Sequence, residues 1–312
     1  MKNFLLVAYK PKFISSNAFL TLLKKHIGEK KAGYSGTLDP FASGLLIIGF
    51  GAYTKLLPFL TKSPKCYRAT LFLGAQSTTL DIEGIQKVEL IKPLCLDNIL
   101  QVLDSLQGEI SYIPPQFSAK HINGTRAYKL ARSGVSFQLE RQNMRVFGLK
   151  LLAYNHPFLS FEVCLDEGGY VRSIGELISS KLGVSGALSA LERISEGVFS
   201  LDSDTLRLTS KKEGELSHQI FEFKAHRFSY THTQARFFII PPDYALPFAK
   251  MPPLCTQDMA LHGKKPTLLN AKSGIYQWFF RDFFSIIEIK ENGGFAYICN
   301  RIPYADTLQK TR

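Results

Sequence analysis

The sequence lacks the features that mark membrane proteins, secreted disulfide-rich proteins and zinc-binding modules. No apolar run approaches the ~20 residues of a membrane-spanning helix, and the N-terminal run at 4–8 is too short for a secretory signal. Five cysteines are spread widely without any C-x-x-C pair. We therefore expect a cytoplasmic protein with no membrane association, whose cysteines are reduced, mostly buried thiols, with neither a disulfide framework nor a structural zinc site.

Motifs for cofactors, nucleotides and catalytic metals are missing as well. There is no G-x-x-x-x-G-K-[ST] phosphate loop, no G-x-S-x-G elbow and no H-E-x-x-H pair, and Gly49-Phe50-Gly51 is an incomplete dinucleotide fingerprint. The seven histidines are scattered without metal-ligand spacing. We expect no metal site and no cofactor.

Acidic residues are scarce relative to basic ones. Lys and Arg number 38 against 26 Asp and Glu, which gives a net charge of +12. Eleven Lys and Arg face two acids in residues 1–80, and seven face one acid in residues 118–150. Such concentrated basic blocks favour a polyanionic partner such as a nucleic acid. A basic surface that only maintains solubility is the alternative.

Helices and strands mix without a βαβ rhythm, which predicts an α+β fold with a mainly antiparallel sheet and flanking helices. Ser15 is an expected N-cap, Ser173 and Glu176 an expected capping box, and residues 188–194 an expected short helix. The length predicts about two domains. A Pro-rich stretch near residue 250 divides the chain into a domain at 1–246 and a small β-rich domain at 254–312.

A glycine-rich loop at 33–44 contains Asp39, the only carboxylate between Glu29 and Asp81. Glycines permit close approach of another backbone, and the surrounding cations should keep the carboxylate ionised. This combination indicates a nucleophile or base presented to a polyanionic substrate. Asp39-Pro40 as an ordinary turn is the other interpretation.

The loop resembles the signature of the TruB family of bacterial tRNA pseudouridine-55 synthases, G-H-[ST]-G-x-L-D-P-x-A-[ST]-G. Further matches follow in chain order: Lys10-Pro11 with Ser15-Ser16, Lys65-Cys66-Tyr67-Arg68, Thr79-Leu80-Asp81 to Gly84, the block from Pro114 through Lys120 to Gly134, Gly169 to Ser173, and Leu191-Glu192-Arg193. The sequence departs from the family at Tyr34, where the family has histidine, and at Phe13, where it has glycine. Phe13 therefore indicates a locally rebuilt turn.

The resemblance implies that Asp39 is the catalytic nucleophile or base, that Arg172 pairs with it, and that Tyr67 stacks on the target base. From its strand pattern alone, Tyr67 could equally be a core residue. Predicted substrate-binding residues are Tyr34, Lys10, Lys55, Lys120, Arg132, Tyr170 and Leu191. Lys55 and Lys120 could instead be ordinary solvated lysines.

The implied reaction converts uridine 55 in the T-loop of tRNA to pseudouridine, after the base is flipped into a pocket. The expected partner is the tRNA T-arm, with no obligate protein partner, and the enzyme is expected to be a monomer. Two alternatives remain: a guide-RNA-dependent pseudouridine synthase of the archaeal and eukaryotic type, and a tRNA-folding helper whose catalysis is secondary.

Overall fold

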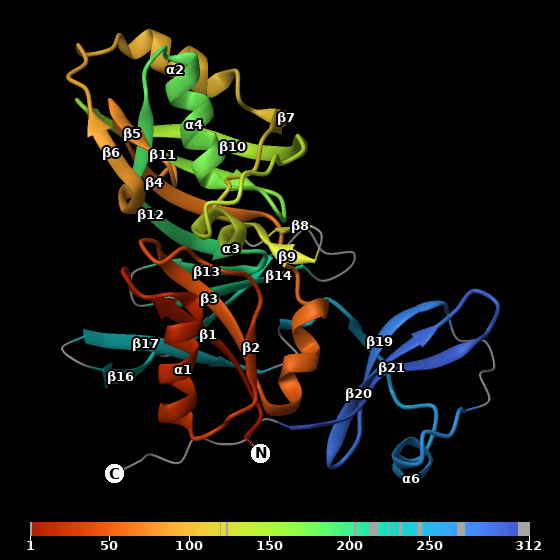
Figure 1. The fold of residues 1–312 in the computed structure, drawn as a ribbon. Helices are drawn as coiled ribbons and strands as arrows, with labels where there is room; N and C mark the ends of the chain where they lie inside the picture. The colour runs from red at the N-terminus through yellow and green to blue at the C-terminus, as the bar shows by residue number, and fades with distance from the viewer. Residues whose placement is uncertain are drawn as a thin grey trace.

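The computed structural model describes residues 2–118, 120–122, 124–202, 205–211, 218–223, 225–230, 233–241, 245–266 and 272–304. One large sheet dominates the fold (Figure 1). Its main path runs through β16 (His226–Tyr230), β17 (Thr233–Ile240), β1 (Phe4–Lys10), β3 (Ser43–Phe50), β12 (Gly186–Glu196), β4 (Lys65–Leu73), β11 (Phe158–Leu165), β10 (Gln142–Asn155) and β7 (Gly108–Tyr112). Strands β2 (Ala32–Tyr34), β13 (Phe199–Asp202), β14 (Thr205–Lys211) and β15 (His218–Phe223) extend it.

The pairing is antiparallel along this path except between β3 and β12, which run parallel. This parallel junction joins the two halves of the sheet that are labelled in the lower and upper parts of Figure 1. The α+β class with a mainly antiparallel sheet is therefore confirmed. Gly44 permits the junction, because a Cβ there would lie 2.3 Å from the backbone oxygen of Arg193 in β12.

Helices cover each half of the sheet separately. Helix α1 (Ser16–Ile27) begins where Ser15 accepts a hydrogen bond from the Ala18 amide, and its apolar stripe packs on β1 and β3. Helices α2 (Leu96–Asp104) and α4 (Val171–Lys181) pack over β4, β10 and β11. Within the described part of the chain, no helix combines the length and apolarity needed to cross a bilayer.

Shorter elements connect these layers. They are the 3-10 helices η1 (Gly51–Phe59) and η2 (Ile82–Gly84), helix α3 (Ala127–Arg132), and the strands β5 (Ala75–Ser77), β6 (Ile85–Val88), β8 (His121–Ile122) and β9 (Thr125–Arg126). The strands form two small hairpins, β5–β6 and β8–β9.

The C-terminal region is β-rich, as predicted. Strands β18 (Ala249–Lys250), β19 (Gly274–Phe279), β20 (Phe283–Ile289) and β21 (Phe295–Pro303) form a separate sheet beside helix α6 (Gln257–Leu261). Phe284 and Ile286 of β20 join the same apolar core as Tyr53 and Leu56 of η1. The region therefore packs against the large sheet, and a division at 1–246 and 254–312 stays a prediction.

Two local predictions about secondary structure are wrong. Residues 188–194 belong to strand β12 rather than to a helix, because they pair with both β3 and β4 and form bulges at two points. A short apolar run does not reveal this from its spacing alone. Helix α4 begins at Val171, so Ser173 lies inside its first turn and donates to the Ile113 carbonyl instead of capping.

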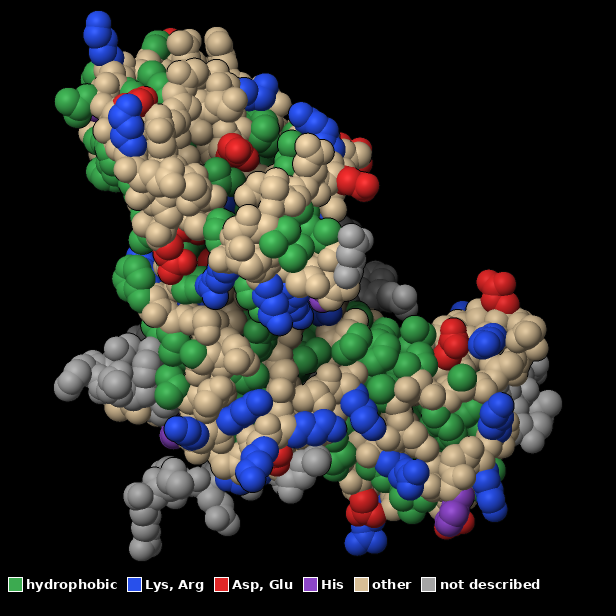
Figure 2. Space-filling view, in the orientation of Figure 1, with side chains coloured by type: hydrophobic (Ala, Val, Ile, Leu, Met, Phe, Trp, Pro, Cys, Tyr) green, Lys and Arg blue, Asp and Glu red, His purple; other side chains and the backbone are tan. Residues whose placement is uncertain are grey.

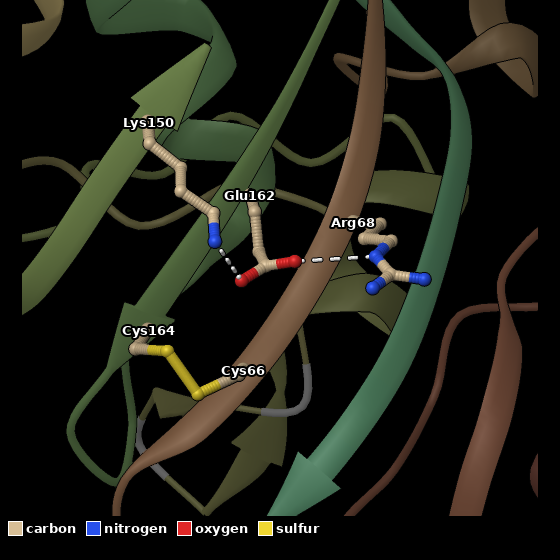
Figure 3. The surroundings of a disulfide bond; sticks show 5 residues. All are labelled: Cys66, Arg68, Lys150, Glu162 and Cys164. Carbon is tan, nitrogen blue, oxygen red and sulfur yellow. Dashed lines mark hydrogen bonds and ion pairs between the residues drawn. A yellow bond between two sulfur atoms is a disulfide. The ribbon is translucent and has the colours of Figure 1, made fainter. Parts of the chain in front are cut away.

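The prediction that all cysteines are reduced is also wrong. Cys66 of β4 and Cys164 of β11 form a disulfide (Figure 3). The two residues face each other in the antiparallel register of these strands, and such partners lie close together. Their wide separation of 98 residues in the sequence concealed the pair. The free cysteines are Cys95, Cys255 and Cys299.

Candidate active site

The glycine-rich loop links β2 to β3 and is fixed to the start of helix α1. The Ser16 hydroxyl accepts from the Leu38 amide and donates to the Leu38 carbonyl, each at 2.9 Å. A tight turn follows, in which the Ala42 amide donates to the Asp39 carbonyl at 3.1 Å. These bonds hold the Asp39 backbone rigidly while its side chain stays 30% exposed.

Lys10 lies beneath this loop and is fully buried. Its ammonium donates to the carbonyls of Pro11, Ile14 and Pro40 at 2.9, 2.7 and 3.3 Å. Burial lowers the pKa of Lys10 to about 8, although the Asp39 charge opposes the shift. Lys10 is a predicted substrate-binding residue. In the structure its buried ammonium instead holds the turn at 11–14 to the glycine-rich loop.

Arg172 forms a two-pronged pair with Asp39. Its Nε lies 2.9 Å from Asp39 Oδ2 and its Nη2 lies 3.1 Å from Oδ1. The guanidinium is itself held by the carbonyls of Thr79 and Phe117 at 3.0 and 2.9 Å. A guanidinium that faces both carboxylate oxygens and is itself held by two carbonyls fixes the position and the orientation of the carboxylate.

A second carboxylate shares this arginine. Asp81 is 2% exposed, and its Oδ2 lies 3.5 Å from Arg172 Nη1. Thr79 donates its hydroxyl to Asp81 Oδ1, and the Glu83 amide donates to the same oxygen at 3.0 Å. We refer to Asp39, Arg172 and Asp81 as the Asp39 cluster.

The pKa of Asp39 reflects this crowded setting. Burial raises the pKa above the usual value, Arg172 and Lys10 lower it, and the Asp81 charge raises it again. The two cations favour the charged form, as expected, but loss of hydration has the larger effect on the pKa. That Asp39 is ionised stays a prediction.

Two predicted residues, Tyr67 and Tyr170, lie close enough to Asp39 to interact with its charge. Tyr67 of β4 is 8% exposed, packs with Leu38, Phe41 and Leu191, and lies opposite Arg193 of β12. Burial raises the pKa of Tyr67, while Arg193, which hydrogen-bonds its hydroxyl, lowers it. Tyr170 is half-buried; its pKa is raised by burial, and it also interacts electrostatically with Arg172 and Asp39.

A second charged group contacts the start of the same loop. Glu196 is fully buried, and its carboxylate lies 3.6 Å from Lys65 Nζ and 3.3 Å from Arg193 Nη2. Ser35 donates to it at 2.7 Å, and Arg193 also donates to the Gly36 carbonyl at 3.3 Å. We refer to Glu196, Lys65 and Arg193 as the Glu196 cluster.

Among the contacts of the described residues, none joins the remaining predicted residues to Asp39. Tyr34 lies on β2 opposite Ile48, and Lys55 is exposed on η1 near Cys299. The Lys120 ammonium donates to Gln142. Arg132 is exposed at the end of α3, 5.7 Å from the centre of the Tyr128 ring, and its charge reaches Glu83 beside Asp81.

Sequence reasoning missed the roles of Asp81 and Glu196. Asp81 had a detectable signal, because it sits in the T-x-D-x-x-G turn and is the next acid after Asp39 in a basic region. Glu196 had none, since its partners come from β4, β12 and the loop, and only the folded sheet brings them together.

The fold and the site together define a class. A paired aspartate and arginine at the junction of a mixed sheet, with a buried tyrosine beside them, are what the loop's resemblance implies for a pseudouridine synthase. A family model described as "TruB family pseudouridylate synthase (N terminal domain)" matches residues 24–171.

The relatives make the assignment specific. The chain is 51% identical to a tRNA pseudouridine synthase B of Helicobacter hepaticus over the full length of both proteins. It is 56% identical over 197 residues to that of Campylobacter jejuni strain RM1221, covering 63% of this chain and 72% of the relative. This chain belongs to the TruB family of pseudouridine synthases.

Solved structures share the architecture. A chain in a Cbf5-Nop10-Gar1 complex is 25% identical with a TM-score of 0.51, covering 64% of this chain and 51% of that chain. A chain in an H/ACA RNP bound to a substrate RNA containing 2'-deoxyuridine has a TM-score of 0.58 at 19% identity, covering 96% of this chain and 84% of that one. The latter likeness concerns the fold alone.

Proposed function

We propose that this protein converts uridine 55 in the T-loop of tRNA to pseudouridine, with Asp39 acting on the target nucleoside. The observation that carries the proposal is the two-pronged Asp39–Arg172 pair, in which the arginine is 4% exposed and the carboxylate 30% exposed. The pair is rigid, yet one partner remains accessible to a substrate. The relatives named tRNA pseudouridine synthase B supply the substrate class.

The reaction exchanges one glycosidic bond for another. The bond from N1 of uracil to the ribose C1′ breaks, the base turns, and C5 bonds to C1′; the proton leaves C5 and N1 gains one. A carboxylate can form a transient covalent bond or remove a proton in such a sequence. Attack on C1′, attack on C6 and removal of a 2′ proton all remain open routes for Asp39.

The target base must leave the stack to reach Asp39. Tyr67 and Tyr170 supply two rings near the carboxylate, and Leu191 belongs to the same apolar core as Tyr67. We assign them to the pocket that receives the base, with Tyr67 stacking on it. Tyr34, on the strand that leads into the loop, is assigned to the gap that the flipped base leaves in the RNA.

Phosphate contacts provide the binding energy that offsets flipping. Figure 2 shows Lys and Arg side chains gathered over the lower half of the visible face, which carries α1 and β2 in Figure 1. We assign Lys55, Lys120 and Arg132 to this function. The proposal further holds that the enzyme works in the cytoplasm as a monomer, without a protein partner, and that residues 254–312 are an RNA-binding domain.

The test is to incubate the protein with an unmodified tRNA transcript and to map pseudouridine by chemical probing. Pseudouridine at position 55 with wild-type protein, and none with Asp39→Asn, is the expected result. Activity that appears only after addition of a guide RNA would replace this function by that of a guide-dependent synthase. A protein that refolds tRNA without forming pseudouridine would indicate a folding helper.

A further inference from the structure

Phe13 combines two properties that rarely occur together. Its side chain is 72% exposed, and its backbone has a φ of +62°. That left-handed conformation is unfavourable for a residue with a bulky side chain and suits glycine instead. A strained residue that also exposes an aromatic ring to water gains nothing for the folded state from its side chain.

The turn that carries Phe13 is fastened to the catalytic loop. The Phe13 amide donates to the Pro40 carbonyl at 2.7 Å, one residue after Asp39. The buried Lys10 ammonium joins the Pro11 and Ile14 carbonyls of this turn to the same Pro40 carbonyl. The ring is therefore presented from a backbone held in fixed register with Asp39.

Strain of this kind persists at positions where the surrounding structure over-determines it, and such positions cluster at ligand sites. The segment around Phe13 is basic: residues 2–31 contain seven lysines and Glu29 as the only acid. A basic surface with an exposed ring suits a nucleic acid better than an apolar protein partner.

We propose that Phe13 is a stacking platform for an unpaired base of the RNA substrate, next to the base that enters the Asp39 pocket. This proposal rests on the proposed function, since it takes RNA as the substrate. Loop bases present open faces for stacking on aromatic rings. Phe13 then fixes the RNA loop at the rim of the site while Tyr67 and Tyr170 lie inside.

The variant Phe13→Gly removes both the ring and the strain, and the two losses have different readouts: stability for the strain and RNA affinity for the ring. We expect a thermal unfolding midpoint that is unchanged or slightly higher, together with weaker binding of an unmodified T-arm RNA. Stacking of one base contributes ~1–3 kcal/mol, which is about 5- to 150-fold in Kd. Phe13→Asn, which tolerates positive φ without a ring, should lose affinity to the same extent.

Two further variants identify the interaction. Phe13→Trp should retain affinity, whereas Phe13→Leu should bind as weakly as Phe13→Gly, since an aliphatic side chain cannot stack. The matched control is Phe158→Leu, another exposed aromatic. Phe158 faces Phe72 on β4. Phe72 is five residues from Tyr67 along this strand, a distance of about 17 Å at the usual rise per residue. Replacing Phe158 should therefore leave the Kd for RNA unchanged.

Wild-type affinity in Phe13→Gly and Phe13→Asn would overturn the proposal, as would full affinity in Phe13→Leu. If Phe13→Gly unfolds at a lower temperature, the RNA affinities of Phe13→Leu and Phe13→Trp decide whether the ring stacks on a base. Failure of the proposed function looks different: wild-type protein would then form no pseudouridine, whatever the Kd values of the Phe13 variants.

Discussion

The Asp39 cluster and the Glu196 cluster flank one loop and are built from the same groups, yet they differ in balance and exposure. The first has two carboxylates around one guanidinium, and Asp39 is 30% exposed. The second has two cations around one carboxylate, and Glu196 and Arg193 are at most 1% exposed. A carboxylate must be reachable to act on a substrate, so the first cluster suits chemistry and the second suits support.

The charge balance leads to the same distinction. In the Asp39 cluster burial and a second negative charge both raise the pKa of Asp39, which makes its carboxylate a better proton acceptor than an ordinary aspartate. Glu196 instead lies between Lys65 and Arg193 and accepts from Ser35. The cluster therefore anchors the start of the loop, because Ser35 donates to Glu196 and the Gly36 carbonyl accepts from Arg193.

The largest expected effect comes from Asp39→Asn. The amide keeps the shape but cannot act as nucleophile or base, so the single-turnover rate should fall by about 10⁴-fold or more. Because the folded protein disfavours the Asp39 charge, stability at neutral pH should be equal or higher, as thermal unfolding would report. Near wild-type turnover by this variant would remove Asp39 from the mechanism.

Arg172→Lys should be the next most damaging. Lysine keeps the charge but cannot hold both Asp39 oxygens as well as the Thr79 and Phe117 carbonyls. A shift of about 1 Å in the carboxylate can lower the rate about 100-fold, and rapid-quench assays at saturating enzyme would measure it. Retention of most activity would show that charge, rather than the planar fork, is what the site requires.

Glu196→Gln should affect stability rather than chemistry. It leaves Lys65 and Arg193 buried without a counter-charge, which costs about 3–5 kcal/mol, measured by urea unfolding. The matched control is Glu162→Gln, whose carboxylate on β11 bridges Lys150 of β10 and Arg68 of β4 (Figure 3) and is 18% exposed. Screened pairs of this kind contribute about 0–1 kcal/mol, so equal losses in the two variants would contradict the assignment.

The smallest effect is a shift in pH dependence. If Asp39 acts as a carboxylate, the single-turnover rate rises with pH as it loses its proton, and the midpoint lies above the usual aspartate pKa. Asp81→Asn removes a negative charge that raises the Asp39 pKa, so this acidic limb should move to lower pH. Asp104→Asn, an exposed change on α2, should leave it in place, and an upward shift in Asp81→Asn would contradict the account.

Contiguous motifs could be predicted from the sequence, whereas contacts between distant strands of the sheet could not. The loop at 33–44 and the Arg172 motif are contiguous patterns, and the structure joins them as expected. Strand β12, the Cys66–Cys164 bond and the Glu196 cluster all depend on pairing between distant strands. No local spacing encodes such pairing.

Lysines illustrate the same limit at the level of single residues. Lys10 and Lys55 are both predicted substrate-binding residues in a basic segment. The structure buries Lys10 among three carbonyls and leaves Lys55 exposed. Two of these carbonyls come from the turn that follows Lys10, and the third, that of Pro40, comes from the glycine-rich loop thirty residues away. Composition does not reveal this arrangement.

The most direct test of the central claim measures both clusters on one substrate. Asp39→Asn and Glu196→Gln are each mixed in excess with unmodified tRNA, below their unfolding temperatures, and the pseudouridine formed in a single turnover is followed. The account predicts bound tRNA without pseudouridine for Asp39→Asn, and a rate within about tenfold of wild type for the folded Glu196→Gln protein. Wild-type rates from Asp39→Asn, or equal collapse of both variants while folded, would contradict it.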